Sequence, residues 1–252
     1  EQAGRPMSNP QSITLLCRDK LRCQEWLDTF GVRQPPVEAD SAMFRKRLTD
    51  WGFAFLKPRF GALGTSVNRV APTDDLPVFL PSVVPGQEDP AILQRAVSPP
   101  LGWAGRSVRV LCQRMPDHSW YQCPAVLRQS RTDPVVNAAR GAAVMPAADG
   151  LSVDTMEQIS HACAQVCSAI TAADGGRWAV ELGVDLVIDS DGVPWVIEVN
   201  SRPRGRLQVL AALDGERFAD AHVQACARPI RTMAHLLRTE AVSDVRGGVK
   251  CR

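Results

Sequence analysis

Three oxygen-bearing side chains in the C-terminal part of the chain have the types and spacing of a magnesium site. Glu198 and Asn200 are two positions apart in the run WVIEVN, so on a β-strand both side chains point to the same face. Asp185 lies in the preceding apolar run, which the turn sequence DSDG connects to WVIEVN as a hairpin. Mg²⁺ prefers hard oxygen ligands, usually one or two carboxylates completed by phosphate and water. The hairpin therefore predicts a magnesium site formed by Asp185, Glu198 and Asn200.

A solvated hairpin with acids on its wet face is the alternative interpretation of this segment. The other residues of WVIEVN are apolar enough to belong to a core. A carboxylate among such residues is costly unless it is paired or coordinated. This argument favours the metal site over the solvated hairpin.

A second group of residues has the types expected around a chain of phosphates. Lys57 ends the apolar run FAFLK and opens onto a loop that contains Gly61 and Gly64. A bare ammonium is unfavourable in a buried strand, and a phosphate oxygen would satisfy it. Glycines let backbone N–H groups approach phosphates closely. An ordinary glycine hairpin remains the alternative, because the sequence contains neither GxGxxG nor a Walker A motif.

The composition excludes several classes of protein. Lys+Arg number 29 against 27 Asp+Glu, a net charge of +2 that gives no general basic field for nucleic acid. No apolar run is long enough to cross a membrane, and the polar start is unlike a signal peptide. The 8 cysteines are scattered without a CxxC pair, which is typical of reduced thiols. We therefore expect a soluble, cytoplasmic protein that binds neither nucleic acid nor membrane; the residues before Met7 are a remnant or part of a longer chain.

Periodicity and turn residues predict the elements that position these side chains. Helices are expected over residues 19–30, 42–51, 152–175 and 218–238, the last interrupted near Pro229. Strands are expected at residues 53–57, 66–70, 77–84, 91–97, 107–114, 120–129, 184–188 and 195–199. Mostly antiparallel strands with helices outside them define the α+β class.

Five sequence blocks, taken in order, resemble the ATP-grasp superfamily: DKLRCQEWLDTFGVRQPP, FLKPRFGALGTSV, ILQRAV, GRSVRVLCQR and GVDLVIDSDGVPWVIEVNSRP. The chain looks most similar to the YheC/YheD-type, spore-coat-associated branch. The resemblance implies an α+β ATP-grasp fold in which two α+β lobes clamp Mg-ATP. The implied domain covers residues 18–240, with a small lobe at about 38–90 and a large lobe at about 91–240. Residues 1–17 are expected to be an N-terminal extension or remnant, and residues 241–252 a flexible tail.

The resemblance also implies roles for individual residues. It implies that ATP contacts Lys20, Lys57, Gly61, Gly64, Thr65, Ser66, Gln94, Arg95 and Val97. In this set the two lysines are similar to the family lysines at the phosphates, and residues 94–97 to the strand that holds adenine through its main chain. Asp185, Glu198 and Asn200 match the family's magnesium ligands. Arg109 and Arg128 are the implied catalytic residues, near the transferring phosphate or the substrate carboxylate. Arg202 directly follows the strand of the metal ligands, and from this position we predict that it binds the carboxylate of an incoming substrate.

Two features depart from the family pattern. Ser107 stands where many relatives have an acid, two residues before Arg109. Relatives also carry an N-terminal α/β domain, and this domain is expected to be missing or severely shortened here, because few residues precede Lys20. Either the chain is a fragment of a longer protein, or a partner protein or a second copy of the chain completes the substrate site.

The resemblance implies an ATP- and Mg²⁺-dependent ligase. A substrate carboxylate would attack ATP to give an acyl phosphate, and an amine, such as that of an amino acid or peptide, would displace the phosphate. Two alternatives stay open: a non-catalytic ATP-grasp domain that acts in binding or assembly, which Ser107 favours, and a phosphotransferase on the same scaffold. The intact set of polar ligands favours ligation over these two alternatives.

Overall fold

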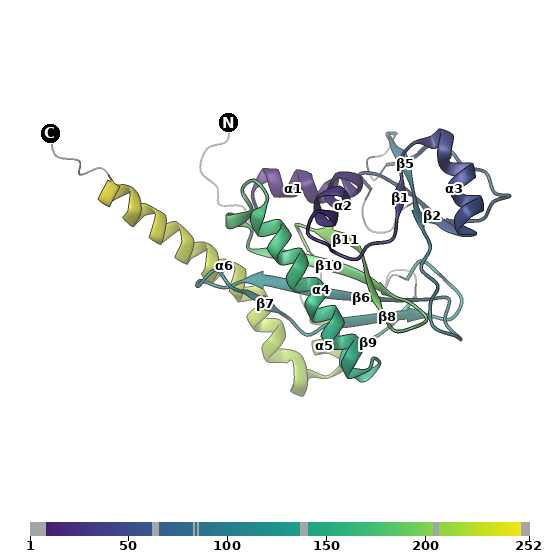
Figure 1. The fold of residues 1–252 in the computed structure, drawn as a ribbon. Helices are drawn as coiled ribbons and strands as arrows, with labels where there is room; N and C mark the ends of the chain where they lie inside the picture. Colours follow the sequence, from purple (N-terminus) through teal and green to yellow (C-terminus); the bar gives the residue numbers. More distant parts are fainter. Residues whose placement is uncertain are drawn as a thin grey trace.

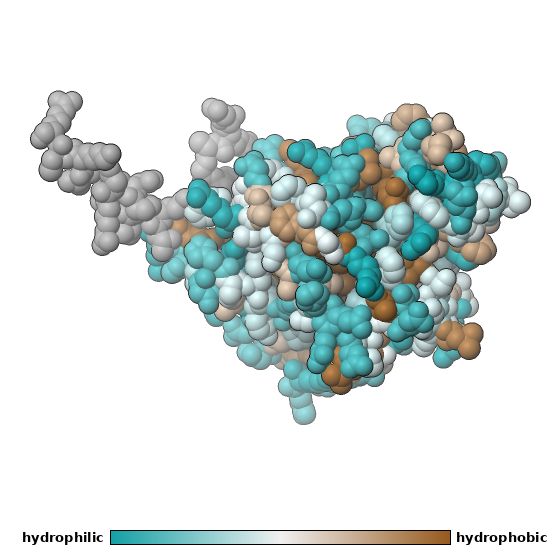
Figure 2. Space-filling model, viewed as in Figure 1, coloured by the Kyte–Doolittle hydropathy of each residue, from teal (hydrophilic) through white to brown (hydrophobic). Residues whose placement is uncertain are grey.

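The computed structural model describes residues 9–61, 66–82, 84, 86–136, 141–203 and 207–247, and side chains as far as Arg238. It contains two antiparallel sheets with helices packed outside them (Figure 1). This arrangement confirms the α+β class predicted from the sequence. Apolar side chains on the face seen in Figure 2 lie in small groups among hydrophilic ones, as is usual for a surface in water.

The helices are α1 (Gln11–Arg18), α2 (Lys20–Asp28), α3 (Phe44–Trp51), α4 (Val153–Ala172), α5 (Gln208–Leu213) and α6 (Gly215–Gly247), with 3-10 turns at η1 (Ser41–Met43), η3 (Ala147–Asp149) and η4 (Gly176–Trp178). The strands are β1 (Val37–Glu38), β2 (Ala54–Pro58), β3 (Asn68–Val70), β4 (Phe79–Pro81), β5 (Glu88–Arg95), β6 (Gly105–Arg114), β7 (Trp120–Gln122), β8 (Val126–Ser130), β9 (Ala143–Pro146), β10 (Glu181–Ile188) and β11 (Pro194–Asn200). In the described residues, no helix is long and apolar enough to span a membrane.

The first sheet has the strand order β1-β5-β2-β3, and β4 pairs with β5. Phe44 and Leu48 of α3 pack against its inner face, beside Leu56 and Leu93. The predicted hairpin of β2 and β3 is present. Residues 91–95 also pair within this sheet, with β2, whereas the predicted lobe boundary assigned them to the large lobe. Their backbone hydrogen bonds to β2 and β1 hold them in the first sheet.

The second sheet has the order β11-β10-β6-β8-β9, with β7 at the side of β6. One face packs against α4, α1 and α2 in the largest hydrophobic core, where Ile159 and Val166 meet Val110 and Leu182. The opposite face packs against α5 and α6 through a smaller core. The DSDG hairpin predicted from the sequence is formed by β10 and β11.

Several elements differ from the sequence predictions, and β1, β9 and α5 lie where no element was expected. Helix α1 was not predicted, and its Ile13 and Leu16 belong to the largest core. The strand expected at residues 120–129 is divided into β7 and β8. Helix α6 continues through Pro229 to Gly247, instead of breaking at Pro229 and ending at Arg238. Pro229 is buried on the packed side of α6, so tertiary contacts offset the loss of one helical hydrogen bond.

Candidate functional site

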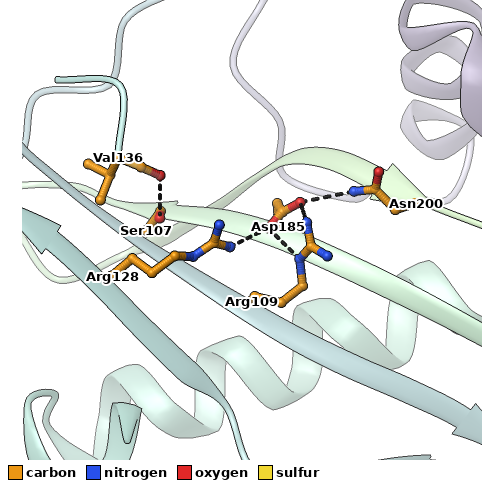
Figure 3. Close-up of polar contacts among 6 residues, drawn as sticks. All are labelled: Ser107, Arg109, Arg128, Val136, Asp185 and Asn200. Carbon is orange, nitrogen blue, oxygen red and sulfur yellow. Dashed lines mark hydrogen bonds and ion pairs between the residues drawn. The ribbon is translucent and has the colours of Figure 1, made fainter. Parts of the chain in front are cut away.

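Asp185 lies at the centre of a polar cluster on the second sheet. It pairs opposite Glu198 of β11 on one side and opposite Arg109 of β6 on the other. Arg128 of β8 pairs opposite Ser107, two residues before Arg109 on β6. Residues two apart on a strand share a face. The antiparallel register therefore brings side chains from four strands to one place (Figure 3).

Both oxygens of the Asp185 carboxylate accept hydrogen bonds in this cluster. Arg109 donates from Nε to Oδ1 at 2.6 Å and from Nη2 to Oδ2. Arg128 Nη2 donates to Oδ1 at 2.7 Å, and Asn200 Nδ2 donates to Oδ2 at 3.0 Å. Burial acts to raise the pKa of Asp185, but the two arginines outweigh it and hold the pKa below its ordinary value. The carboxylate is therefore ionised at neutral pH.

Glu198 is in a different state from Asp185. Within the described part of the chain its carboxylate accepts no hydrogen bond, although it lies among the charges of Lys20, Asp185, Lys57 and Arg109. Burial raises the pKa of Glu198; Lys20 opposes that shift and Asp185 adds to it. A carboxylate that is partly buried, lies near three basic groups and accepts no hydrogen bond from a described residue has capacity for a further ligand.

These residues fit a magnesium ion in part. The Glu198 carboxylate and the Asn200 amide oxygen are hard donors of the kind that Mg²⁺ takes. Asp185 is already held by two guanidinium groups, so it could bind a cation only by releasing at least one of these contacts. Over the described ranges there is no group of three or more His, Cys, Asp or Glu side chains that could hold a metal. A magnesium ion here would depend on phosphate and water for its remaining ligands.

A small cavity between the two sheets is lined by both lysines that are predicted to bind phosphate. Lys20 of α2, Lys57 and Gln94 of the first sheet and Glu198 of the second sheet all line it. Its volume is about 10 Å³, which is enough for about one water molecule. A nucleotide would therefore have to move the lining residues in order to enter.

Lys57 is buried, and its Nζ donates to Gln94 Oε1 at 2.7 Å. Burial is the main cause that lowers the pKa of Lys57 to about 7; repulsion from Lys20 adds to it, and Glu198 opposes it. The amide of Gln94 carries no charge that would compensate the ammonium. Lys57 therefore has no direct ionic partner within the described residues. An ammonium in this state can bind an incoming anion without first releasing a carboxylate.

The start of α2 is joined to the end of β2 by contacts that the sequence analysis missed. Arg59 and Asp19 form a bidentate salt bridge, in which Arg59 Nε and Nη2 each lie 2.7 Å from an oxygen of the Asp19 carboxylate. Lys20 N donates to Arg59 O at 3.2 Å, while Lys20 Nζ donates to the carbonyls of Pro58, at 3.1 Å, and Gly61. The available signal was a pair of opposite charges beside the two lysines, because Asp19 precedes Lys20 and Arg59 follows Lys57 by two residues.

Close packing explains the glycine at position 61. A Cβ atom there would lie 2.3 Å from Pro58 Cγ, which is too close for any side chain. The main chain can pass near the two lysines only because the residue has no side chain. Gly64 and Thr65, which the resemblance also placed at the phosphates, lie outside the described residues.

Four other predicted residues are not part of the cavity wall. Ser66 Oγ donates to Pro81 O at 3.1 Å, and Arg95 lies over the ring of Trp195 at 5.7 Å. Arg202 is exposed. The backbone of Val97, just after β5, makes no hydrogen bond to another described residue, which leaves it available to a ligand. The roles predicted for these residues remain predictions.

The charges of the site favour an anionic ligand. Lys20, Lys57, Arg109 and Arg128 are basic, whereas the acids among them are Asp185 and Glu198. Asp19 and Asp89 also act on Lys20, so the basic groups exceed the acidic ones only slightly in this partly buried region. Positive groups placed in advance around a buried site stabilise phosphate and other spread negative charge.

Comparison with known proteins adds independent information on the fold. The chain has TM-scores of 0.58 with the D-alanine–D-alanine ligase of Bacillus anthracis complexed with ATP, 0.54 with the N5-carboxyaminoimidazole ribonucleotide synthetase of Thermotoga maritima and 0.50 with an L-amino acid ligase of Bacillus licheniformis. The identities are 17, 15 and 15%, with 90, 86 and 78% of this chain covered. The chain spans 70, 49 and 43% of those proteins. At such identities the likeness shows the fold alone.

Sequence comparison identifies the family. No curated protein sequence matches the chain significantly. The profile described as YheC/D like ATP-grasp matches residues 79–221, which is more than half of the 252 residues. The matched region includes the strands that carry Arg109, Arg128, Asp185 and Glu198. The chain therefore belongs to the YheC/D-like ATP-grasp family.

Proposed function

We propose that this protein is an ATP- and Mg²⁺-dependent ligase that joins a carboxylate to an amine through an acyl phosphate. The observation that carries the proposal is a cluster of basic groups where the two sheets meet: Lys20 and Lys57 line the cavity with Glu198, and Arg109 and Arg128 bind Asp185 opposite Glu198 on the second sheet. Three structurally similar proteins are named as ligases or a synthetase, and one of them was seen with ATP.

The lysines would hold the phosphates of the nucleotide. Lys57 Nζ would exchange its hydrogen bond to Gln94 for a phosphate oxygen, and Lys20 Nζ would exchange its bonds to the Pro58 and Gly61 carbonyls. Each exchange replaces a neutral acceptor by an anion, which forms the stronger hydrogen bond. The backbone of residues 94–97 would hold adenine, as the resemblance implies. A bound Mg²⁺, on Glu198 and Asn200 with Asp185 in reach, would neutralise part of the phosphate charge.

The two arginines would act on the transferring group. In the first step a carboxylate oxygen of the substrate attacks the γ-phosphorus of ATP and ADP leaves. In the second step the amine attacks the acyl carbon, inorganic phosphate leaves and the amine loses a proton. Arg109 and Arg128 would contact the spread charge on the transferring phosphoryl group. Asp185 holds both guanidinium groups in place until an anion competes for them.

A non-catalytic nucleotide-binding or assembly role is the second candidate, and two observations favour it. Ser107 stands where many relatives have an acid, two residues before Arg109, and its hydroxyl donates to Val136 O at 3.5 Å, a long contact. Asp185 is also fully occupied by arginines and Asn200. Such a protein would bind ATP weakly or not at all, and a partner protein would supply the remaining surface. A phosphotransferase would instead release a stable phosphorylated product.

Calorimetric titration with Mg-ATP tests the nucleotide half of the proposal. We expect binding by the wild type and a loss of at least about tenfold in affinity for Lys57→Ala and Glu198→Ala, because each removes a charged contact. Lys46→Ala is the matched control, since Lys46 is exposed on α3. Absence of ATP binding by the wild type would refute the proposal.

The ligation half needs a product assay. ADP release is measured with a mixed pool of amino acids and peptides, and mass spectrometry identifies what forms. An amide product supports ligation, a phosphorylated product supports the phosphotransferase, and ATP binding without ADP release supports the non-catalytic role. Arg109→Lys should reduce ADP release more than ATP affinity, because its predicted contact is to the transferring group.

A further inference from the structure

Asp185 binds Arg109 and Arg128 in the way that the two arginines would bind an anion from outside the protein. Arg109 donates from Nε to one carboxylate oxygen, at 2.6 Å, and from Nη2 to the other. Arg128 Nη2 donates to the first of these oxygens at 2.7 Å. Two parallel bonds from one guanidinium are the geometry by which arginine recognises carboxylates and phosphates. A carboxylate of the chain itself therefore fills the anion position of this arginine pair (Figure 3).

The arginine pair has donors left after Asp185 is bound. A guanidinium carries five N–H groups, and Asp185 accepts from two nitrogens of Arg109 and one of Arg128. Nε of Arg128 is buried and has no partner among the described residues. A Cβ atom at Gly183 would lie 3.0 Å from Arg109 Nη1, so the glycine leaves room beside this guanidinium. The carboxylate that the pair holds therefore satisfies it only in part.

The charges beside the arginine pair also leave it open to a further anion. Asp185 is the one carboxylate bonded to the two guanidinium groups within the described residues. Glu198 acts on Arg109 through its charge, but it accepts no hydrogen bond from a described residue. Ser107, which pairs opposite Arg128, is uncharged. Residue 107 therefore does not compete for Arg128 as a carboxylate would.

We propose that Asp185 is an internal competitor: it occupies the anion position on Arg109 and Arg128 and keeps outside anions away until another cation draws it off. Asp185 is 6% exposed, and a buried carboxylate that leaves its basic partners without gaining a new one is strongly disfavoured. The closed state is therefore the stable one without a ligand. The proposed function supplies the other cation, the Mg²⁺ expected at Glu198 and Asn200, and the opening step rests on that function.

The internal competitor makes anion binding depend on the metal. Asn200 Nδ2 donates to Asp185 Oδ2 at 3.0 Å, so the carboxylate keeps one partner when it turns from the arginines toward the metal site. Before that turn, an anion has to displace a carboxylate with the same geometry; after it, both guanidinium groups are available. The anion is an oxyanion of the proposed reaction, either the substrate carboxylate or the transferring phosphoryl group. Metal and oxyanion should therefore strengthen each other's binding, since such coupling is reciprocal.

Titration calorimetry with inorganic phosphate, without metal or nucleotide, tests the internal competitor. Asp185→Asn keeps the shape of the side chain and removes its charge. This variant should bind phosphate at least about tenfold more tightly than the wild type, the effect of about one charge-assisted hydrogen bond. Asp149→Asn is the matched control, because Asp149 pairs with Arg217 at the surface, and it should bind phosphate as the wild type does. Arg109→Gln added to Asp185→Asn should remove the gain.

A parallel titration with sodium acetate identifies the oxyanion that the arginine pair prefers. If Asp185→Asn raises the affinity for acetate by the larger factor, the pair is fitted to the substrate carboxylate. If it raises the affinity for phosphate by the larger factor, the pair is fitted to the phosphoryl group. Either gain supports the internal competitor and assigns its anion.

Thermal unfolding keeps the test decisive if Asp185→Asn lowers the stability of the protein. An anion that occupies the empty position stabilises the folded variant. Phosphate at ten times its dissociation constant should raise the Tm of Asp185→Asn by roughly 3 to 6 °C. At the same phosphate concentration, the Tm of the wild type and of Asp149→Asn should rise less.

Two results would overturn the internal competitor. One is a phosphate affinity of Asp185→Asn that is no higher than that of the wild type, because the position is then closed to outside anions even without the carboxylate. The other is a gain that survives Arg109→Gln, because phosphate then binds elsewhere. Neither measurement uses ATP, so both results are distinct from a failure of the proposed ligase activity.

Titration of phosphate in the presence of Mg-ADP tests the opening step. Saturating Mg-ADP should raise the phosphate affinity of the wild type by a larger factor than that of Asp185→Asn, because only the wild type has a competitor to remove. An equal factor in both proteins would contradict opening by the metal. A wild type that binds no Mg-ADP would instead count against the proposed function, and against the opening step with it.

Discussion

Lys57 is a buried lysine whose only direct hydrogen-bond partner within the described residues is an uncharged amide. Its pKa is lowered to about 7 from an ordinary value of 10.5, chiefly by burial. Asp185, by contrast, is a buried acid with two basic partners and a lowered pKa. The two residues show opposite ways of carrying charge in a folded protein: Asp185 is compensated internally, whereas Lys57 is available to a ligand that brings its own negative charge.

The state of Lys57 predicts how stability depends on pH. Between about pH 7 and pH 10 the unfolded chain keeps a proton that the folded protein has released, so the free energy of unfolding should rise with pH. The gain assigned to Lys57 is at most about 3 kcal/mol between pH 7 and 9.5. Denaturant unfolding at both pH values measures it in the wild type and in Lys57→Met, where this gain should disappear. Lys46→Met, in which an exposed lysine is replaced, is the control and should retain the gain. If stability depends equally on pH in all three proteins, the pKa of Lys57 is not lowered in the folded state.

At the level of secondary structure, the start of α2 and the end of β2 behave as one unit. Asp19 caps α2 by accepting from Arg22 N and also binds Arg59. The pair is partly exposed, with 31% of the Arg59 and 14% of the Asp19 side chain accessible, so its contribution to global stability is at most about 1 kcal/mol. Its stronger effect is local, because it holds Lys20 beside the glycine loop.

Arg59→Gln should loosen this connection without unfolding the protein. We expect amide hydrogen exchange to quicken at Lys20, whose N–H bonds to the Arg59 carbonyl, while the amides of α4 keep their rates. Arg69→Gln is the control on the same sheet, since Arg69 stacks on Phe53 away from α2. Unchanged exchange at Lys20 would show that the ion pair does not fix the start of the helix.

Local signals in the sequence predicted the elements whose partners lie nearby in the chain. The DSDG turn fixed the hairpin of β10 and β11, and the spacing of Glu198 and Asn200 placed both on one strand. The sequence did not reveal that Arg109 and Arg128 both bind Asp185, because these residues are 76 and 57 positions away. Such contacts depend on which strands become neighbours, and no periodicity carries that information. The continuation of α6 through Pro229 could not be predicted for a related reason. Tertiary packing there outweighs the local tendency of proline to end a helix.

At the scale of the whole molecule, the candidate site exists only where the two sheets meet. Lys57 and Gln94 belong to the first sheet, Glu198 belongs to the second, and Lys20 is held between them by α2. Arg95 of the first sheet lies over the ring of Trp195, which belongs to the second sheet. Arg33, in the loop between α2 and β1, lies over the same ring. Because the present cavity holds about one water molecule, a triphosphate can enter only if lining residues, which belong to both sheets, move. Nucleotide binding should therefore change the hydrogen exchange of strands in both sheets.

This coupling predicts a joint response to Mg-ATP. At a nucleotide concentration one hundred times its dissociation constant, binding stabilises the folded state by about 2.7 kcal/mol, which corresponds to a rise of roughly 5 to 10 °C in Tm for a chain of this size. Hydrogen exchange should change in β2 and β5 and, in the same titration, in β10 and β11. At nucleotide concentrations near the wild-type dissociation constant, Glu198→Ala should weaken both changes together, although the residue lies on only one sheet, and Lys46→Ala should weaken neither. Protection confined to one sheet would mean that the nucleotide does not bind between them.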